Sequence, residues 1–299
     1  RWSNIYQLSN QTVANFGVDK LSEKFAQQNT YDSNRETVGY FAGVTGTLDR
    51  LTLQMNLRHD EVNVDRIASN VSKSNTTKSS TGLFGIGYQL DDAWRLTSTV
   101  SSAFRAPTAY EAYKNSLLTP ETHLAKEAGV AYKTDQTLAK LVYFETSTTD
   151  AIVYKNSTYV NVGELNNKGL EATLRANWRG HSLKASLVSQ DPWNVSENTA
   201  LTRRARHYGS VDISRPFGAY EVGTRVYTSG ARNDMDYSTS QPVDLSGYTL
   251  WSFYASRKID NEWTARVKLE NAFNREYQLA YGYNTPGRGI YATLQYQPK

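Results

Sequence analysis

The sequence predicts an all-β protein, a transmembrane antiparallel β-barrel. Two observations carry this prediction: segments in which apolar and polar residues alternate, and connections that are alternately short and long. Residues 51–58 (LTLQMNLR) are apolar at the odd positions, and residues 263–270 (WTARVKLE) repeat the pattern. Successive side chains on a strand point to opposite faces, so each segment has one apolar and one polar face. Short turns that alternate with long loops are typical of outer-membrane barrels, whose apolar face meets lipid.

The alternation predicts about fifteen strands. They are expected at residues 2–9, 13–25, 37–47, 50–62, 81–90, 94–105, 123–133, 137–154, 161–178, 182–190, 205–216, 220–229, 247–258, 262–275 and 288–297. Short connections are expected at 10–12, 48–49, 91–93, 134–136, 179–181, 217–219 and 259–261, and long ones near 26–36, 63–80, 106–122, 155–160, 191–204, 230–246 and 276–287. Pro107, Pro120, Pro242 and Pro286 fall in long connections, where proline fits irregular loops but would weaken strands.

Composition supports a membrane protein without helical spans. The chain contains no run of about eighteen apolar residues, which excludes transmembrane helices, and alternating strands explain the mean hydropathy of -0.61. The 21 Tyr and 6 Trp favour membrane interfaces, although a tyrosine-rich soluble β-protein would share this composition. The net charge of +4 is spread evenly, so nucleic acid is not an expected partner.

Signatures of enzymes and metal sites are missing from the sequence. It has no Gly-x-Ser-x-Gly elbow, no Walker loop and no His-Glu-x-x-His motif, so we do not expect an enzyme. The four His are dispersed, and no metal site is predicted from them. Asp234 and Asp236 form the closest acidic pair. Either a calcium or ligand role or an ordinary solvated loop would fit this pair, and the solvated loop is the simpler reading.

The order of short and long connections indicates whether the chain would form a whole barrel. The first connection is short, so the first strand runs toward the periplasm and begins outside. Single-chain bacterial barrels have an even number of strands and both termini in the periplasm. We therefore expect this chain to be the C-terminal part of a larger barrel with an unpaired first strand. One miscounted strand would remove the inference.

Several motifs resemble the barrel of TonB-dependent outer-membrane receptors. Residues 101–108 (SSAFRAPT) resemble the "gyaFRAPt" strand end, and residues 118–121 (LTPE) resemble the segment that follows it. Residues 161–171 (NVGELNNKGLE) match the "N.g.a..kGvE" strand. Residues 271–277 (NAFNREY) match "N.lFd..Y", and residues 286–288 (PGR) precede the last strand. The motifs occur in the family's order.

The resemblance implies a 22-stranded barrel whose lumen is filled by an N-terminal plug. Residues 1–299 would then be one barrel domain that lacks the plug and the first strands. The implied protein is a monomeric receptor in the outer membrane, in contact with lipid, that engages TonB through the missing N-terminal region. A passive porin-like pore is the alternative from another class, and the residues give no independent support for an adhesin or phage-docking surface.

Within the family, the likeness is greatest to the vitamin B12 (cobalamin) receptors. It rests on residues 201–205 (LTRRA), 230–237 (GARNDMDY) and 281–283 (YGY). Iron-siderophore and haem receptors share much of the scaffold and stay open as alternatives. The calcium sites of the cobalamin receptors lie mostly in early loops without a counterpart here. No metal ligand or cofactor is therefore assigned, and calcium is left to the complete receptor.

The resemblance implies that Arg203 and Tyr237 contact cobalamin. Corrinoids have a broad apolar ring edged with amides, which an amphipathic Tyr and a five-donor guanidinium suit. The alternative is that Arg203 and Arg204 form salt bridges between loops while the tyrosines line the rim. Further aromatic residues in the long connections are secondary candidates: Tyr110, Tyr113, Trp193, Tyr281 and Tyr283.

Overall fold

The computed structural model describes residues 1–27, 31–68, 71–155 and 157–298. Sixteen strands form one antiparallel sheet, two more form a separate hairpin, and one short helix lies in a loop. The elements are β1 (Trp2–Ser9), β2 (Thr12–Gln27), β3 (Tyr31–Leu48), β4 (Leu51–Ala68), β5 (Val71–Gln89), β6 (Trp94–Arg105), α1 (Ala109–Lys114), β7 (Glu121–Lys133), β8 (Thr137–Lys155), β9 (Thr158–Trp178), β10 (His181–Asn194), β11 (Thr199–Ala200), β12 (His207–Phe217), β13 (Tyr220–Ser229), β14 (Arg232–Asp236), β15 (Gln241–Leu245), β16 (Tyr248–Lys258), β17 (Trp263–Glu270) and β18 (Gly289–Tyr296).

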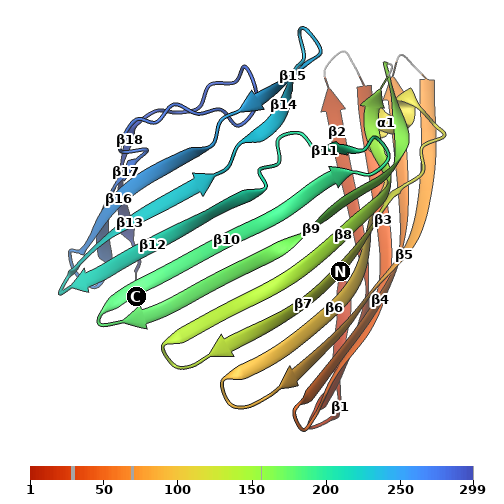
Figure 1. The fold of residues 1–299 in the computed structure, drawn as a ribbon. Coiled ribbons are helices and arrows are strands. Elements are labelled where there is room, and N and C mark those ends of the chain that lie inside the picture. Colours follow the sequence, from red (N-terminus) through yellow and green to blue (C-terminus); the bar gives the residue numbers. More distant parts are fainter. Residues whose placement is uncertain (28–30, 69–70, 156, 299) are drawn as a thin grey trace.

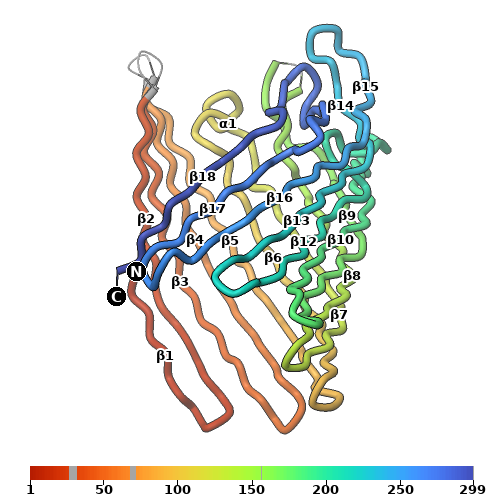
Figure 2. Tube along the Cα trace, turned by 90° about the vertical axis from the view of Figure 1, so that its left-hand side faces the viewer, coloured from red at the N-terminus to blue at the C-terminus, as the bar shows by residue number. Residues whose placement is uncertain are grey.

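The sheet is a curved antiparallel meander whose main path follows the chain from β1 to β10 and then runs through β12, β13, β16, β17 and β18 (Figure 1). The two-residue strand β11 pairs with β10 beside this path. All fifteen predicted strands are present on its main path, which confirms the predicted fold class. The sheet curves like the wall of a barrel, with β1 at one edge and β18 at the other (Figure 1, Figure 2). Among the described residues, β1 pairs only with β2. No described helix is long and apolar enough to cross a membrane.

The two faces of the sheet differ as the alternation predicts. The Arg58 side chain bonds to Asp60 and Asp19, so these groups share the concave face, where α1 also lies (Figure 2). The intervening positions of β4 point outward. Their side chains are apolar and exposed: Leu53 41%, Met55 47% and Leu57 55%. Exposed apolar side chains in a continuous band indicate contact with lipid and not with water.

Aromatic side chains mark the ends of the strands at the short turns. Trp94 pairs with Tyr132 at a ring separation of 4.8 Å, and Trp263 pairs with Tyr296 at 4.7 Å. Trp178 lies at the same end of β9. Rings of this kind gather where the hydrocarbon layer meets the polar headgroups. This belt defines the lower boundary of the apolar band.

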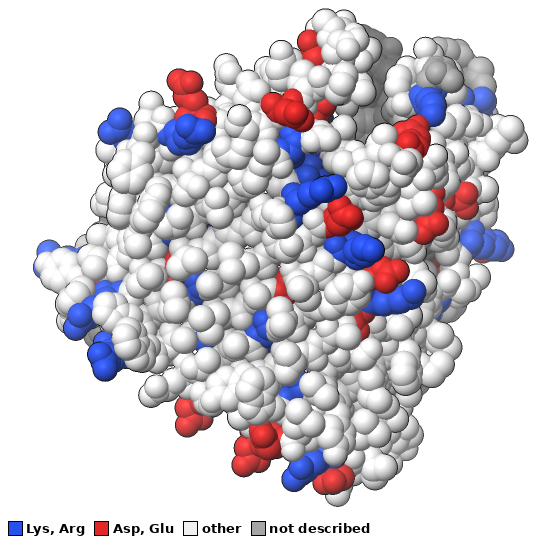
Figure 3. Space-filling view, viewed as in Figure 1, with Lys and Arg blue, Asp and Glu red and all other residues white. Residues whose placement is uncertain are grey.

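A row of alternating charges crosses the outward face at the other boundary (Figure 3). Lys126 is opposite Glu145 in the ladder, Glu145 is opposite Lys168, and Lys168 is opposite Asp191. Asp191 then forms an ion pair of 3.1 Å with Arg206. Opposite charges directly across strands stabilise a sheet, and their place above the apolar band is where lipid headgroups begin.

Three connections predicted to be long are short, because the strands on both sides extend far into them, which corrects the predicted lengths. The ladders continue to Gln27↔Tyr31, Ala68↔Val71 and Lys155↔Thr158. The hairpins therefore extend beyond the apolar band, where the outward face becomes polar. In β4 the apolar side chains change to the concave face, at Val62 and Val64. Cross-strand ion pairs replace the outward apolar side chains, such as Lys78–Glu61 at 3.0 Å and Lys20–Glu36 at 2.9 Å.

Three predicted loops contain regular structure, and in the connection between β10 and β12 it is only the two-residue strand β11. The connection after β6 holds α1, which starts at a capping box formed by Thr108 and Glu111. The connection after β13 holds the β14–β15 hairpin, in which Pro242 lies opposite Met235. Proline was expected only in irregular loops, and that expectation was wrong here. A two-stranded hairpin is all edge, so a strand position without an N–H donor is tolerated.

Candidate functional site

A cleft of about 720 Å³ opens at the end of the sheet opposite the short turns. Three separate segments form it: the connection between β11 and β12, the tip of the β14–β15 hairpin, and the connection between β17 and β18. Its lining residues are Arg203, Asp236, Tyr237, Ser238, Ala280, Tyr281, Gly282 and Tyr283.

The hairpin tip presents Tyr237 to the cleft. The Asp236 carboxylate accepts hydrogen bonds from the backbone N–H of Ser238 at 2.8 Å and from its hydroxyl at 2.6 Å. The N–H of Ser240 donates to the Asp236 carbonyl at 2.7 Å, which closes the turn. An Asp side chain that caps its own turn fixes a tight loop locally. Tyr237 therefore stands out at the apex, 70% exposed.

Tyr281 and Tyr283 flank a second tight turn. Gly282 has a φ of +79°, a left-handed conformation that glycine adopts without steric cost. The Tyr283 N–H donates to the Ala280 carbonyl at 3.2 Å. The glycine thus allows two tyrosines to approach the same cleft from one short loop.

Asp234 fastens the three segments together. Its side chain is fully buried and accepts from Arg203 Nε at 2.8 Å, from the Tyr281 N–H at 2.7 Å and from the Met235 N–H at 2.8 Å. The Arg203 N–H also donates to the Asn233 carbonyl at 2.7 Å. A buried carboxylate with three donors is well satisfied and rigid. Arg203 therefore forms an ion pair between loops, which was the alternative role predicted for it.

Arg203 itself is held in a strained backbone conformation. Its φ is +59°, in the left-handed region that non-glycine residues rarely adopt. The bonds to Asn233 and Asp234 maintain it, and they bring the guanidinium carbon within 5.2 Å of the Tyr237 ring centre. Strain of this kind gathers at binding sites, where the surrounding contacts fix one geometry. A cation over an aromatic face is also mutually stabilising.

The charges in the cleft stay ionised near neutral pH. Burial by itself raises the pKa of Asp234, but the N–H groups of Tyr281 and Met235 and the Arg203 guanidinium outweigh it, so the pKa is lowered. The hydrogen bond to Asp234 raises the pKa of Arg203. The Asp236 pKa is lowered by the bonds from Ser238. The pair is therefore a carboxylate and a guanidinium, and neither changes charge under physiological conditions.

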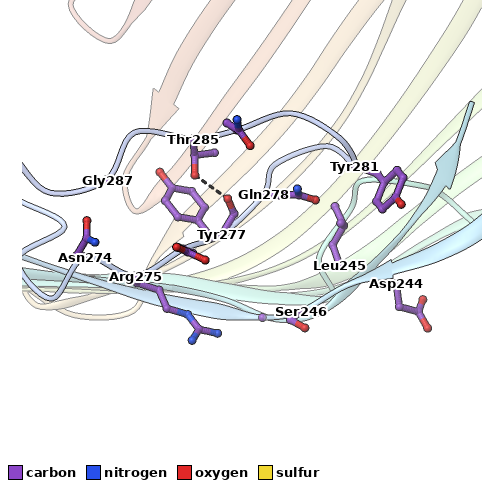
Figure 4. A pocket seen from close by; sticks show the side chains of 13 residues that line it. Asp244, Leu245, Ser246, Asn274, Arg275, Tyr277, Gln278, Tyr281, Thr285 and Gly287 are labelled. Carbon is purple, nitrogen blue, oxygen red and sulfur yellow. Dashed lines mark hydrogen bonds between the residues drawn. The ribbon is translucent and has the colours of Figure 1, made fainter.

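Figure 4 shows a second cleft of about 680 Å³. It adjoins the first, because Tyr281 lines both. Residues 244–247 form one wall, and the connection from Asn274 to Gly287 forms the other. The Thr285 hydroxyl donates to the Tyr277 carbonyl at 2.6 Å and holds this loop closed on itself (Figure 4). The two clefts are parts of one mouth.

Sequence reasoning missed the residues beneath this mouth. Arg232 is buried, donates to the Ser229 hydroxyl at 3.1 Å and to the Gln278 carbonyl, and lies 5.3 Å from the Tyr248 ring centre. Tyr248 in turn packs against Tyr277 at 4.4 Å. The arginine lies in the segment 230–237 that carried the resemblance, and this was the available signal.

The remaining predicted residues lie elsewhere. Tyr110 and Tyr113 belong to α1, far along the sheet from the β14–β15 hairpin (Figure 1). Trp193 lies near the end of β10, half-buried and opposite Ala200 of β11, and it lines neither cleft. The structure thus brings together Arg203, Tyr237, Tyr281 and Tyr283, and separates the other three from them.

Asp234 and Asp236 do not both lie in a solvated loop, which was the simpler expectation for this acidic pair. Asp234 is buried in the ion pair, and only Asp236 reaches the cleft. Within the described residues, no group of three or more His, Cys, Asp or Glu side chains could hold a metal ion.

The family model "TonB dependent receptor-like, beta-barrel" matches residues 2–272. The chain belongs to this family. The FrpB iron transporter from Neisseria meningitidis (F3-3 variant) superposes with a TM-score of 0.82 at 16% identity, over 98% of this chain and 54% of that chain. The copper transporter OprC gives 0.81 at 16% identity, over 98% and 55%. The unliganded ferric citrate transporter FecA gives 0.74 at 14% identity, over 98% and 51%.

Family membership fixes several points. The chain is a TonB-dependent receptor-like barrel of the outer membrane, and the family is one of receptors. The chain spans about half the length of the structures it matches. These structures share the fold at low identity, so they leave the ligand to be argued from the cleft.

Proposed function

We propose that this chain is part of an outer-membrane receptor for the TonB-dependent uptake of vitamin B12 (cobalamin). One observation carries the proposal: residues picked out by their likeness to cobalamin receptors, from three separate segments, line one cleft. Arg203 and Tyr237 would be the principal contacts, with Tyr281 and Tyr283 beside them.

The chemistry of the cleft suits this ligand. Three tyrosine rings offer rigid surfaces to an apolar macrocycle, and their hydroxyls reach amide groups at its edge. The Nε of Arg203 donates to Asp234, and the terminal nitrogens of the guanidinium remain as donors for a ligand in the cleft. Because the bond to Asp234 fixes the guanidinium in advance, little side-chain entropy would be lost on binding.

The complete receptor would work with further partners. We propose that residues 1–299 form one barrel domain, that a plug fills its lumen, and that TonB acts through that N-terminal region. The receptor would be a monomer in lipid, with any calcium bound by loops outside this chain. These proposals rest on family membership, because such wide barrels need a plug.

A second candidate ligand is a metal complex. The similar structures named above include an iron transporter, a copper transporter and a ferric citrate transporter. An iron-siderophore or haem would use the same mouth, and its anionic groups would favour Arg203. The two ligands therefore need to be compared on the same variants.

The test is cobalamin affinity on whole cells that carry the receptor with Arg203→Ala or Tyr237→Ala. Loss of a charged hydrogen bond or a packed ring should cost about 1–3 kcal/mol, roughly ten-fold or more in affinity. Arg204→Ala is the matched control, because the neighbouring arginine is exposed and lines neither cleft. Surface expression must be equal in all variants. Unchanged cobalamin binding in both variants would remove these residues from the site, and tight binding of an iron-siderophore in place of cobalamin would refute the assignment.

A further inference from the structure

A separate cleft of about 290 Å³ lies between the β4–β5 hairpin and α1. Its lining residues are Val64, Arg66, Lys73, Ser74, Asn75, Ala109, Ala112, Tyr113 and Ser116. In both ribbon views α1 stands apart from the β14–β15 hairpin, so this cleft is distinct from the candidate site above (Figure 1, Figure 2).

The cleft concentrates positive charge. Arg66 and Lys73 occupy directly opposed positions of the antiparallel ladder, so their side chains leave the same face of the sheet. Like charges in this arrangement destabilise a sheet. None of the residues lining the cleft is acidic, and Lys73 forms no ion pair with any described residue. Two cationic side chains on one face of the cleft attract an anionic group.

Arg66 is oriented by aromatic rings. Its side chain is buried at 4% exposure, and its guanidinium carbon lies 3.7 Å from the ring centre of Tyr113 and 5.3 Å from that of Tyr110. Stacking holds the guanidinium in one plane, and this planar geometry matches a carboxylate or phosphate. The Lys73 ammonium lies 5.1 Å from the same Tyr113 ring.

The floor of the cleft is apolar. Val64 and Ala112 are buried there, and Ala109 packs against the buried cluster that contains Val64. A small apolar floor beside two cations fits a ligand with an apolar body and one anionic group better than a bare inorganic ion.

We propose that this cleft binds an organic anion, whose carboxylate or phosphate group lies between Arg66 and Lys73 and whose apolar body packs on Val64, Ala112 and the Tyr113 ring. The site is independent of the Arg203 cleft and of its ligand.

The test is calorimetric titration of the detergent-purified receptor with benzoate and with phenyl phosphate, compared with neutral benzamide and with inorganic phosphate. Lys73→Gln should weaken both organic anions by about five-fold or more. The matched control is Lys78→Gln, on the same strand but on the outward face, where it pairs with Glu61. Arg203→Ala should leave both affinities unchanged. The thermal midpoint of Lys73→Gln should stay the same or rise, because a like-charge contact is removed.

Five results would overturn the proposal, four in binding and one in stability. They are equal binding by wild type and Lys73→Gln, binding of benzamide as tight as benzoate, and inorganic phosphate as tight as phenyl phosphate. The fourth is loss of benzoate binding in Arg203→Ala, which would place the anion in the candidate site. A lowered thermal midpoint in Lys73→Gln would make Lys73 a structural residue and would count against the proposal equally.

Discussion

Asp234 is the residue on which the geometry of the candidate site depends. Its carboxylate joins Arg203, the Tyr281 N–H and the Met235 N–H, and it is fully buried. Replacing it by Asn removes the charge and leaves Arg203 without its counter-ion. We expect the Tyr281 amide to exchange hydrogen roughly ten-fold faster or more, because a buried charged hydrogen bond is worth about 1–3 kcal/mol. Hydrogen–deuterium exchange of the peptide that contains Tyr281 measures this.

The same bond gives a pH dependence with a definite sign. The folded pKa of Asp234 is lowered, whereas an unfolded Asp titrates at about 3.9. The stability that the ionised Asp234 carboxylate gives to the loop is therefore complete above about pH 3.9, and it is lost as the pH falls through the folded pKa. Protection of the Tyr281 amide, corrected for intrinsic rate, should be constant from neutral pH to about 5 and fall below 4. Asp234→Asn should lack this step. The control is Asp236→Asn, which affects only its own turn, and a pH step that persists in Asp234→Asn would show that another group fastens the loop.

For single residues of the candidate site, the sequence predicted which residues line the cleft but not which contacts they make. Arg203, Tyr237, Tyr281 and Tyr283 were predicted because they lie in recognisable motifs, and they do share one cleft. The bond between Arg203 and Asp234 joins residues 31 positions apart, and it depends on how two loops fold over the sheet. Alternation of polarity along a strand carries no information about such a contact.

The helix α1 shows how a local signal can be overlooked at the scale of an element. Thr108 and Glu111 have the spacing of a capping box, which predicts a helix start, yet six residues are too few for a helical pattern. Tertiary bonds hold the helix in place. Arg105 donates to Glu111 at 2.9 Å and to Glu121 at 2.8 Å, and Glu121 accepts from the Ile152 N–H at 2.6 Å.

We expect Arg105→Gln to release α1 from the sheet. Both glutamates are only 12% exposed, and each would lose its cation. With Arg105 itself partly exposed, a cost of about 1–3 kcal/mol is appropriate, well below that of a fully buried pair. Amide exchange across residues 109–114 should accelerate. Arg95→Gln, on the same face of β6, is the control, and equal protection of α1 in both variants would show that the capping box alone suffices.

The long hairpins failed as sequence predictions for a related reason. Beyond the apolar band the outward face of the strands is polar, and in β4 the apolar side chains change to the concave face at Val62 and Val64. The periodicity that revealed β4 and β5 inside the band therefore does not continue outside it. The ladder continues nevertheless, because its backbone hydrogen bonds need no apolar face, and cross-strand ion pairs such as Lys78–Glu61 support it. The number and order of the strands on the main path were predictable, whereas their lengths and the short strands β11, β14 and β15 were not.

Across the whole molecule, the assignment of faces is what makes this sheet a membrane wall. Met55 points outward between Val44 and Phe84 on the neighbouring strands, and the adjacent Gln54 points into the concave side beside Gly85. A lysine at position 55 would enter the apolar band, whereas a lysine at position 54 would meet polar surroundings. We expect Met55→Lys to lower the free energy of unfolding by roughly 2–4 kcal/mol and Gln54→Lys to change it little.

The measurement is urea unfolding of the receptor reconstituted in lipid vesicles, with the two lysine variants compared under identical conditions. The pair is closely matched, because the same charge is placed one residue apart on the same strand and only the face differs. Met55→Leu serves as a volume control and should stay near the wild-type value, since volume-conserving apolar exchanges are well tolerated. A larger loss for Gln54→Lys than for Met55→Lys would invert the faces. The apolar side chains of β4 would then line the lumen, and the charged cluster of Arg58, Asp60 and Asp19 would face lipid.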